Sequence, residues 1–69
     1  MSSTVLKRFG DKVRAERERQ GISQEKLGEM AKVHRTYIGM IERGEKNITL
    51  LNICKIAGAL RLKPKDLVE

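Results

Sequence analysis

The sequence has one cysteine, one histidine and no tryptophan among its 69 residues. A single cysteine excludes a disulfide framework, and with only one histidine the usual cysteine and histidine ligand sets of zinc are excluded as well. Phenylalanine and tyrosine occur once each, which is too few rings for a β-sheet surface that binds RNA by base stacking. We therefore expect no metal site and no cofactor.

Long hydrophobic runs are also missing. The most apolar stretch, residues 50–60, is interrupted by Asn52 and Lys55, and it is far shorter than the ~20 residues that a membrane span requires. The first eleven residues include Lys7, Arg8 and Asp11, whereas a secretory signal would need an apolar segment there. The sequence therefore predicts a cytoplasmic protein with no membrane partner.

Positive charge is present in excess. Fifteen Lys and Arg residues stand against nine Asp and Glu residues, which gives a net charge of +6 at pH 7. In a chain long enough for one small domain at most, this excess favours a polyanionic partner. The sequence contains no Ser–His–acid grouping, no phosphate-binding glycine loop and no paired carboxylate site, so we do not expect an enzyme.

Apolar residues recur at helical spacing along the whole chain. The first predicted helix covers roughly residues 4–20, with Ser3 or Thr4 as its start signal and Gly21 as its stop. The other helices have their own signals: Ser23 caps a short second helix, a third runs from His34 to Arg43 before Gly44, Thr49 caps a fourth, and Pro64 opens a fifth. Residues 45–48 are predicted to form a loop.

The same spacing predicts which side chains face the core. In the second helix these are Leu27, Met30 and Ala31, and in the fourth they are Leu50, Ile53, Ile56, Ala57 and Leu60. The sequence thus predicts an all-α fold, a compact five-helix bundle, with residues 1–69 forming a single domain.

Residues 24–43 are the most informative part of the chain. They read as two helices joined by a very short turn, and Gly28 and Ala31 are small enough to let the two helices cross closely. Three apolar side chains would attach this pair to the core: Val33, Ile38 and Ile41. This is the arrangement of a helix-turn-helix, whose second helix is presented to the major groove of DNA.

The outer side of the predicted third helix has residues suited to base recognition. At 100° per residue this side holds Arg35, Thr36, Gly39, Met40 and Arg43. Arginine pairs bidentately with guanine, and threonine and methionine can contact the thymine methyl group. A glycine inside a helix costs about 1 kcal/mol, so Gly39 on an exposed face indicates that something approaches the backbone closely. The pattern favours sequence-specific binding of double-stranded DNA.

The order of these motifs resembles a known family. The pattern consists of Phe9-Gly10, Val13-Arg14, Arg17, Gly21-Ile22-Ser23-Gln24-Glu25-x-Leu27, Ile38-x-x-Ile41-Glu42-Arg43-Gly44 and Thr49-Leu50. Over residues 9–68 it resembles the Cro- and repressor-type helix-turn-helix regulators of the XRE family, which implies a lambda repressor-like DNA-binding domain. Residues 34–38 and 43–49 most resemble the controller proteins of restriction–modification systems.

The resemblance implies a role for individual residues. Base contacts are expected from Arg35, Thr36, Tyr37 and Met40, and contacts to the DNA backbone from Ser23, Gln24, Arg43, Lys46 and Asn47. Arg17 and Glu42 are expected to form an ion pair between the first and third helices. Lys32 stands where the family usually has glycine, and His34 where it usually has Ser, Thr or Asp as the cap of the recognition helix.

The resemblance also implies a homodimer on a palindromic operator. Leu62, Leu67 and Val68 are expected in the dimer interface, because they are apolar and lie near the chain end. Such a dimer acts by occupancy and either blocks or recruits RNA polymerase. Three alternatives stay open: an antitoxin that binds a toxin protein and regulates its own synthesis, the DNA-binding fragment of a phage-type repressor, and an adaptor that kept the fold but lost DNA binding.

Overall fold

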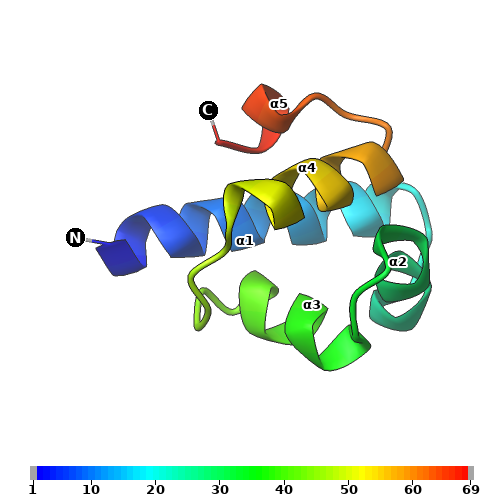
Figure 1. Cartoon of the computed structure of the whole chain (residues 1–69), viewed down its shortest axis with the longest axis horizontal. Helices are drawn as coiled ribbons and strands as arrows, with labels where there is room; N and C mark the ends of the chain where they lie inside the picture. Colours follow the sequence, from blue (N-terminus) through cyan, green and yellow to red (C-terminus); the bar gives the residue numbers. More distant parts are fainter. Residues whose placement is uncertain (1, 69) are drawn as a thin grey trace.

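The computed structural model describes residues 2–68 and contains five α-helices in that range (Figure 1). The helices are α1 (Ser2–Arg19), α2 (Gln24–Ala31), α3 (Arg35–Glu42), α4 (Leu50–Ala59) and α5 (Pro64–Val68). The all-α architecture predicted from the spacing of apolar residues is confirmed. The first helix begins two residues earlier than predicted, and His34 and Arg43 are the caps of α3 rather than its end residues.

The five helices surround one core. The long helix α1 contacts α3 and α5, α2 contacts α3 and α4, and α4 contacts α5. In Figure 1, α3 lies below α1 and α5 lies above it. The core is made of Phe9, Val13, Leu27, Ala31, Ile38, Ile41, Ile56, Ala57, Leu60 and Leu67. Within residues 2–68, no helix is both long and apolar enough to cross a membrane.

Helices α1 to α4 end in the same way. Just beyond each of them one residue adopts the left-handed conformation, with φ between 61° and 72°: Gly21, Lys32, Gly44 and Arg61. After α2, the Lys32 N–H bonds to the Glu29 carbonyl and the Val33 N–H bonds to the Gly28 carbonyl at 2.9 Å, which is the Schellman arrangement. Lys32, which stands where the family usually has glycine, thus adopts the left-handed backbone. The one at Arg61 was not anticipated, because no family motif or turn residue marks it.

Replacing Lys32 by glycine should leave the free energy of unfolding unchanged or raise it by up to ~1 kcal/mol. A side chain at φ 62° is strained, and glycine relieves this strain while adding entropy to the unfolded chain. Urea unfolding measures the difference. Lys26→Gly is the control, because Lys26 lies inside α2 and glycine there should cost about 1 kcal/mol. A clear loss of stability in Lys32→Gly would contradict the strain argument.

Two residues predicted to face the core are exposed. Met30 is 41% exposed, because α2 packs through Leu27, Gly28 and Ala31 and Met30 lies beside that face. Leu50 is 74% exposed, because it is the first residue of α4, ahead of the part that packs inward through Ile56 and Ala57. Both predictions were wrong, since helical periodicity does not say where along a helix the packing stops.

Candidate nucleic-acid interface

Both helices of the helix-turn-helix begin at a side chain that binds a backbone N–H group. At the start of α2, the Ser23 Oγ accepts a hydrogen bond from the Lys26 N–H at 2.9 Å. At the start of α3, Nδ1 of His34 accepts a hydrogen bond from the Thr36 N–H at 3.0 Å. His34 thus performs the capping role that Ser, Thr or Asp performs in most helices. An accepting Nδ1 requires the tautomer with its proton on Nε2.

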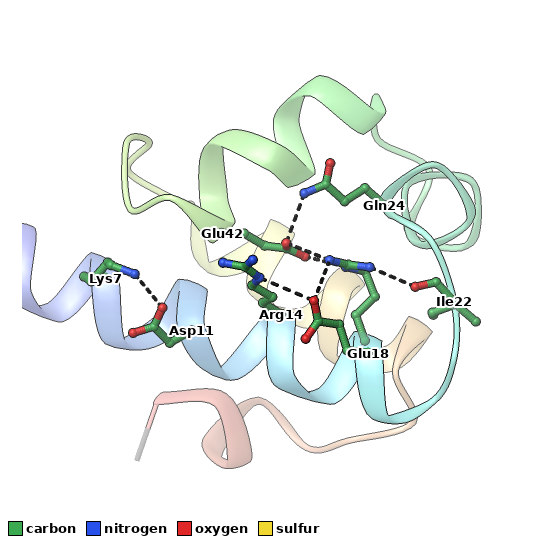
Figure 2. A network of polar contacts seen from close by, with 8 residues as sticks. Lys7, Asp11, Arg14, Glu18, Ile22, Gln24 and Glu42 are labelled. Carbon is green, nitrogen blue, oxygen red and sulfur yellow. Dashed lines mark hydrogen bonds and ion pairs between the residues drawn. The ribbon is translucent and has the colours of Figure 1, made fainter.

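The inner side of α3 is attached to the rest of the protein through Glu42 (Figure 2). Its carboxylate accepts hydrogen bonds from Nε of Arg17 at 2.7 Å, from Nη2 of Arg17 at 3.1 Å and from Nε2 of Gln24 at 3.0 Å. Arg17 also donates from Nη1 to the Ile22 carbonyl at 2.9 Å. The ion pair expected between α1 and α3 is therefore present, with Gln24 of α2 as a third partner.

This ion pair is largely shielded from water. The side chain of Glu42 is 3% exposed and that of Arg17 is 11% exposed. The hydrogen bond to Glu42 raises the pKa of Arg17, while burial acts in the opposite direction. The guanidinium therefore stays charged across the physiological range, and α1, α2 and α3 are held in one arrangement around the carboxylate.

The outer side of α3 presents most of the residues predicted to read bases. Arg35 and Thr36 are exposed at the N-terminal end of the helix, and Met40 is half-buried one turn further on. Arg43 is exposed and forms an ion pair with Glu45, with Nε and Oε2 3.0 Å apart. The structure therefore places a cation and a hydroxyl at the end of α3 that enters the groove first in this motif.

Gly39 does not belong to this outer surface. It is buried, and a Cβ atom built on it would lie 3.2 Å from Nη1 of Arg43 and 3.6 Å from Oε1 of Gln24. The prediction of an exposed glycine was wrong, although the close approach inferred from it exists. The groups that approach belong to the protein itself, and these two side chains cover the middle of α3.

Tyr37 of α3 contacts α4 through its hydroxyl. Its ring is half-buried against the core, and its hydroxyl accepts a hydrogen bond from Nδ2 of Asn52 at 2.9 Å. The hydroxyl proton remains available to an acceptor such as a phosphate oxygen. The contact between Tyr37 and DNA stays a prediction, and the observed role of the side chain is to connect two helices.

The residues predicted to contact the DNA backbone lie before and after α3 in the chain. Ser23 is exposed before α2, Gln24 is half-buried at its first residue, and Lys46 and Asn47 are exposed in the loop after Arg43. The amide nitrogen of Gln24 is bonded to Glu42, which leaves it one N–H for another acceptor.

Two further cations lie beside this loop. Lys7 and Arg8 of α1 line a shallow, open depression together with Thr4, Arg43 and Gly44. The approach is close, because a Cβ atom at Gly44 would lie 3.0 Å from the Cα of Lys7. The sequence pattern does not mark these cations as interface residues, because it does not show that the start of α1 meets the end of α3.

The dimer interface expected near the chain end needs correction. Leu67 is 1% exposed and packs in the core of its own chain, and Leu62 is partly buried against that core. A helix as short as α5 has one inward side, and Leu67 occupies it. Of the three predicted residues, Val68 alone is exposed.

Comparison with known proteins agrees with this geometry. Residues 13–67 match the family described as helix-turn-helix. The chain belongs to the helix-turn-helix family. It is 47% identical to control protein C.BamHI from Bacillus amyloliquefaciens over 70 aligned positions, which cover 100% of this chain and 86% of the relative. It is 46% identical to control protein C.SmaI from Serratia marcescens over 52 residues, 75% of this chain and 62% of the relative.

Solved structures show the same fold. The restriction-modification controller protein C.AhdI from Aeromonas hydrophila superposes with a TM-score of 0.88 at 42% identity, covering 90% of this chain and 94% of its own. The P22 c2 repressor, crystallised with a synthetic operator, superposes with a TM-score of 0.83 at 31% identity, covering 88% and 92%. The chain is a DNA-binding regulator of the XRE type that is similar to restriction–modification controller proteins, as its motifs predicted.

Proposed function

We propose that this protein controls a restriction–modification operon by binding a two-fold symmetric operator as a homodimer. The observation that carries the proposal is the exposed N-terminal end of α3, where Arg35 and Thr36 project from a helix whose inner side is held by Glu42. The similarity to control protein C.BamHI over the whole chain supports the restriction–modification role.

In this function α3 lies in the major groove. Arg35 pairs with O6 and N7 of guanine through two N–H groups, and the methyl groups of Thr36 and Met40 contact thymine. Phosphates on either side are bound by the exposed side chains of Arg43, Lys46 and Asn47 after α3, and by the Ser23 hydroxyl and the half-buried Gln24 amide at the start of α2. Lys7 and Arg8 extend the basic surface along α1, next to Arg43. Occupancy of the operator then blocks or recruits RNA polymerase, according to the position of the site.

Selection of bound duplexes from a random DNA pool tests the proposal. The expected product is a short site with two inverted half-sites, each of which contains a guanine, and we expect the same site in front of the operon that encodes the protein. A neighbouring restriction or methyltransferase gene would support the controller role. Failure to enrich any sequence, together with co-purification of a toxin encoded next to the gene, would favour the antitoxin alternative.

The dimer surface that we propose lies at the end of the molecule formed by the starts of α1 and α4 and by α5. Exposed apolar side chains gather in these three segments: Val5, Leu50, Leu51 and Val68. Val5 and Val68 also border an apolar groove that continues inward over Phe9, Ile48 and Ile53. In Figure 1 this end lies away from α2 and from the start of α3 beside it, so a second copy bound there leaves the exposed N-terminal end of α3 free.

Changing Leu50 or Val68 to glutamate should convert a micromolar dimer into a monomer in sedimentation without DNA. Both side chains are more than half exposed, so the charge costs little in the monomer but is buried without a partner in the dimer. Met30→Glu is the matched control. Met30 is an exposed apolar residue of α2, and α2 lies away from that surface in Figure 1. Met30→Glu should leave the mass unchanged. A dimer that survives both interface changes would place the contact elsewhere.

A further inference from the structure

A carboxylate lies next to the arginine that we propose reads guanine. Oε1 of Glu25 is 4.0 Å from Nη1 of Arg35, and both side chains are 65% exposed. Glu25 belongs to the first turn of α2, where the helix dipole favours an acid. The same position borders the surface proposed to meet DNA, where a negative charge repels phosphates. In a chain of net charge +6, an acid there calls for a further reason.

Beneath this pair, the backbone of residues 33–35 lies unusually close to the backbone of α2 at Gly28. A Cβ atom at Gly28 would lie 2.7 Å from the Val33 carbonyl oxygen and 3.2 Å from the Arg35 nitrogen. Positions 25 and 28 are three residues apart and lie on the same side of a helix. The backbone of Arg35 is therefore pressed against α2 at Gly28, and its side chain ends near the carboxylate one turn away. Gly28 determines where the arginine side chain begins, and Glu25 attracts its charged end.

We propose that Glu25 is a positioning residue for Arg35. Its carboxylate attracts one Nη of the guanidinium toward α2, which leaves the remaining N–H donors for the paired O6 and N7 acceptors of guanine. A flexible arginine loses rotamer freedom when it binds, and an arginine already oriented loses less. The pair is weak in water at this distance, and it strengthens when DNA excludes water from it. The proposal rests on the proposed function, in which Arg35 reads a base.

The test is the variant Glu25→Gln, assayed by fluorescence anisotropy on the selected operator and on a random duplex. The ratio of the two affinities should fall about threefold per half-site, and so about tenfold on a two-fold operator. Random DNA should bind as well as before or better, because a charge that repels phosphate is removed.

Glu29→Gln is the matched control. Glu29 is an exposed acid of the same helix, and none of the ion pairs among the residues that the structure describes includes its side chain. Its neutralisation changes the net charge by the same amount as Glu25→Gln. It should therefore raise the affinity for both duplexes by one common factor and leave the affinity ratio unchanged. Melting temperatures measured by circular dichroism should stay close to that of the parent for both variants.

A double-mutant cycle separates positioning from general electrostatics. In an Arg35→Ala background, Glu25→Gln should no longer change the affinity ratio, because there is no guanidinium left to orient. The proposal is overturned if Glu25→Gln, like Glu29→Gln, leaves the affinity ratio unchanged. It is also overturned if Glu25→Gln still lowers the affinity ratio in the Arg35→Ala background. If Arg35→Ala itself leaves the ratio unchanged, base reading by Arg35 fails too, so the two failures are distinguishable.

Discussion

Replacing Glu42 by alanine is expected to lower the free energy of unfolding by about 3–5 kcal/mol, because it leaves the guanidinium of Arg17 shielded from water without its partner. The loss is large against the total stability of a small domain, which is about 5–15 kcal/mol at most. The amide of Gln24 loses its acceptor at the same time, so the contact between α2 and α3 weakens as well. Urea unfolding followed by circular dichroism measures the change.

The control for this variant is Asp11→Ala. Asp11 pairs with Lys7 across one turn of α1, with Nζ and Oδ1 2.7 Å apart, and both side chains are more than half exposed. Such a surface pair contributes ~1 kcal/mol or less, so the control should unfold close to the parent. If the free energy of unfolding of Glu42→Ala were within ~0.5 kcal/mol of that of the parent, the ion pair of Arg17 and Glu42 (Figure 2) would count as a surface contact.

Replacing Arg35 by alanine should cost about 1–3 kcal/mol per half-site on the operator and much less on random DNA. The arginine lies at the exposed N-terminal end of α3 and presents a planar set of donors that matches the edge of guanine. Its removal therefore reduces the discrimination between operator and random DNA more than it weakens binding to random DNA. Fluorescence anisotropy on both duplexes across a salt series measures the two affinities.

Lys46→Ala is the comparison variant. Lys46 lies exposed in the loop after α3, where a point charge can reach phosphate or sugar but does not distinguish bases. Its removal should lower the affinity for operator and for random DNA by similar factors. It should also lower the slope of affinity against salt concentration by roughly 1 per lost phosphate contact. Equal losses on both duplexes in Arg35→Ala would instead make Arg35 a phosphate contact and refute its role in reading bases.

Much of the fold was predictable because the signals are local. The helices follow from apolar spacing and from caps such as Ser23 and Thr49, each of which binds an N–H three residues ahead. The short turn between α2 and α3 follows from the motif, as does the left-handed backbone of Lys32. Arg17 and Glu42 were paired through the family resemblance, and spacing alone would not have joined residues so far apart.

The errors concern how side chains pack once the helices are assembled. Periodicity placed Gly39 on the outside, but the side chains of Gln24 and Arg43 fold over it. It left Leu67 free for a partner, but the core of the same chain takes up that side chain. The same limitation hid the approach of Lys7 to Gly44.

The local pattern of residues therefore specified which segments are helical, where they stop and which helix has the chemistry of a base-reading element. The packing of the helices specified which side chains remain exposed for DNA or for a second copy, and it brought Glu25 and Gly28 to Arg35. The physical reason is that capping and periodicity depend on neighbours within a few residues. Burial depends instead on how whole helix faces meet, and one linear pattern is compatible with several such arrangements.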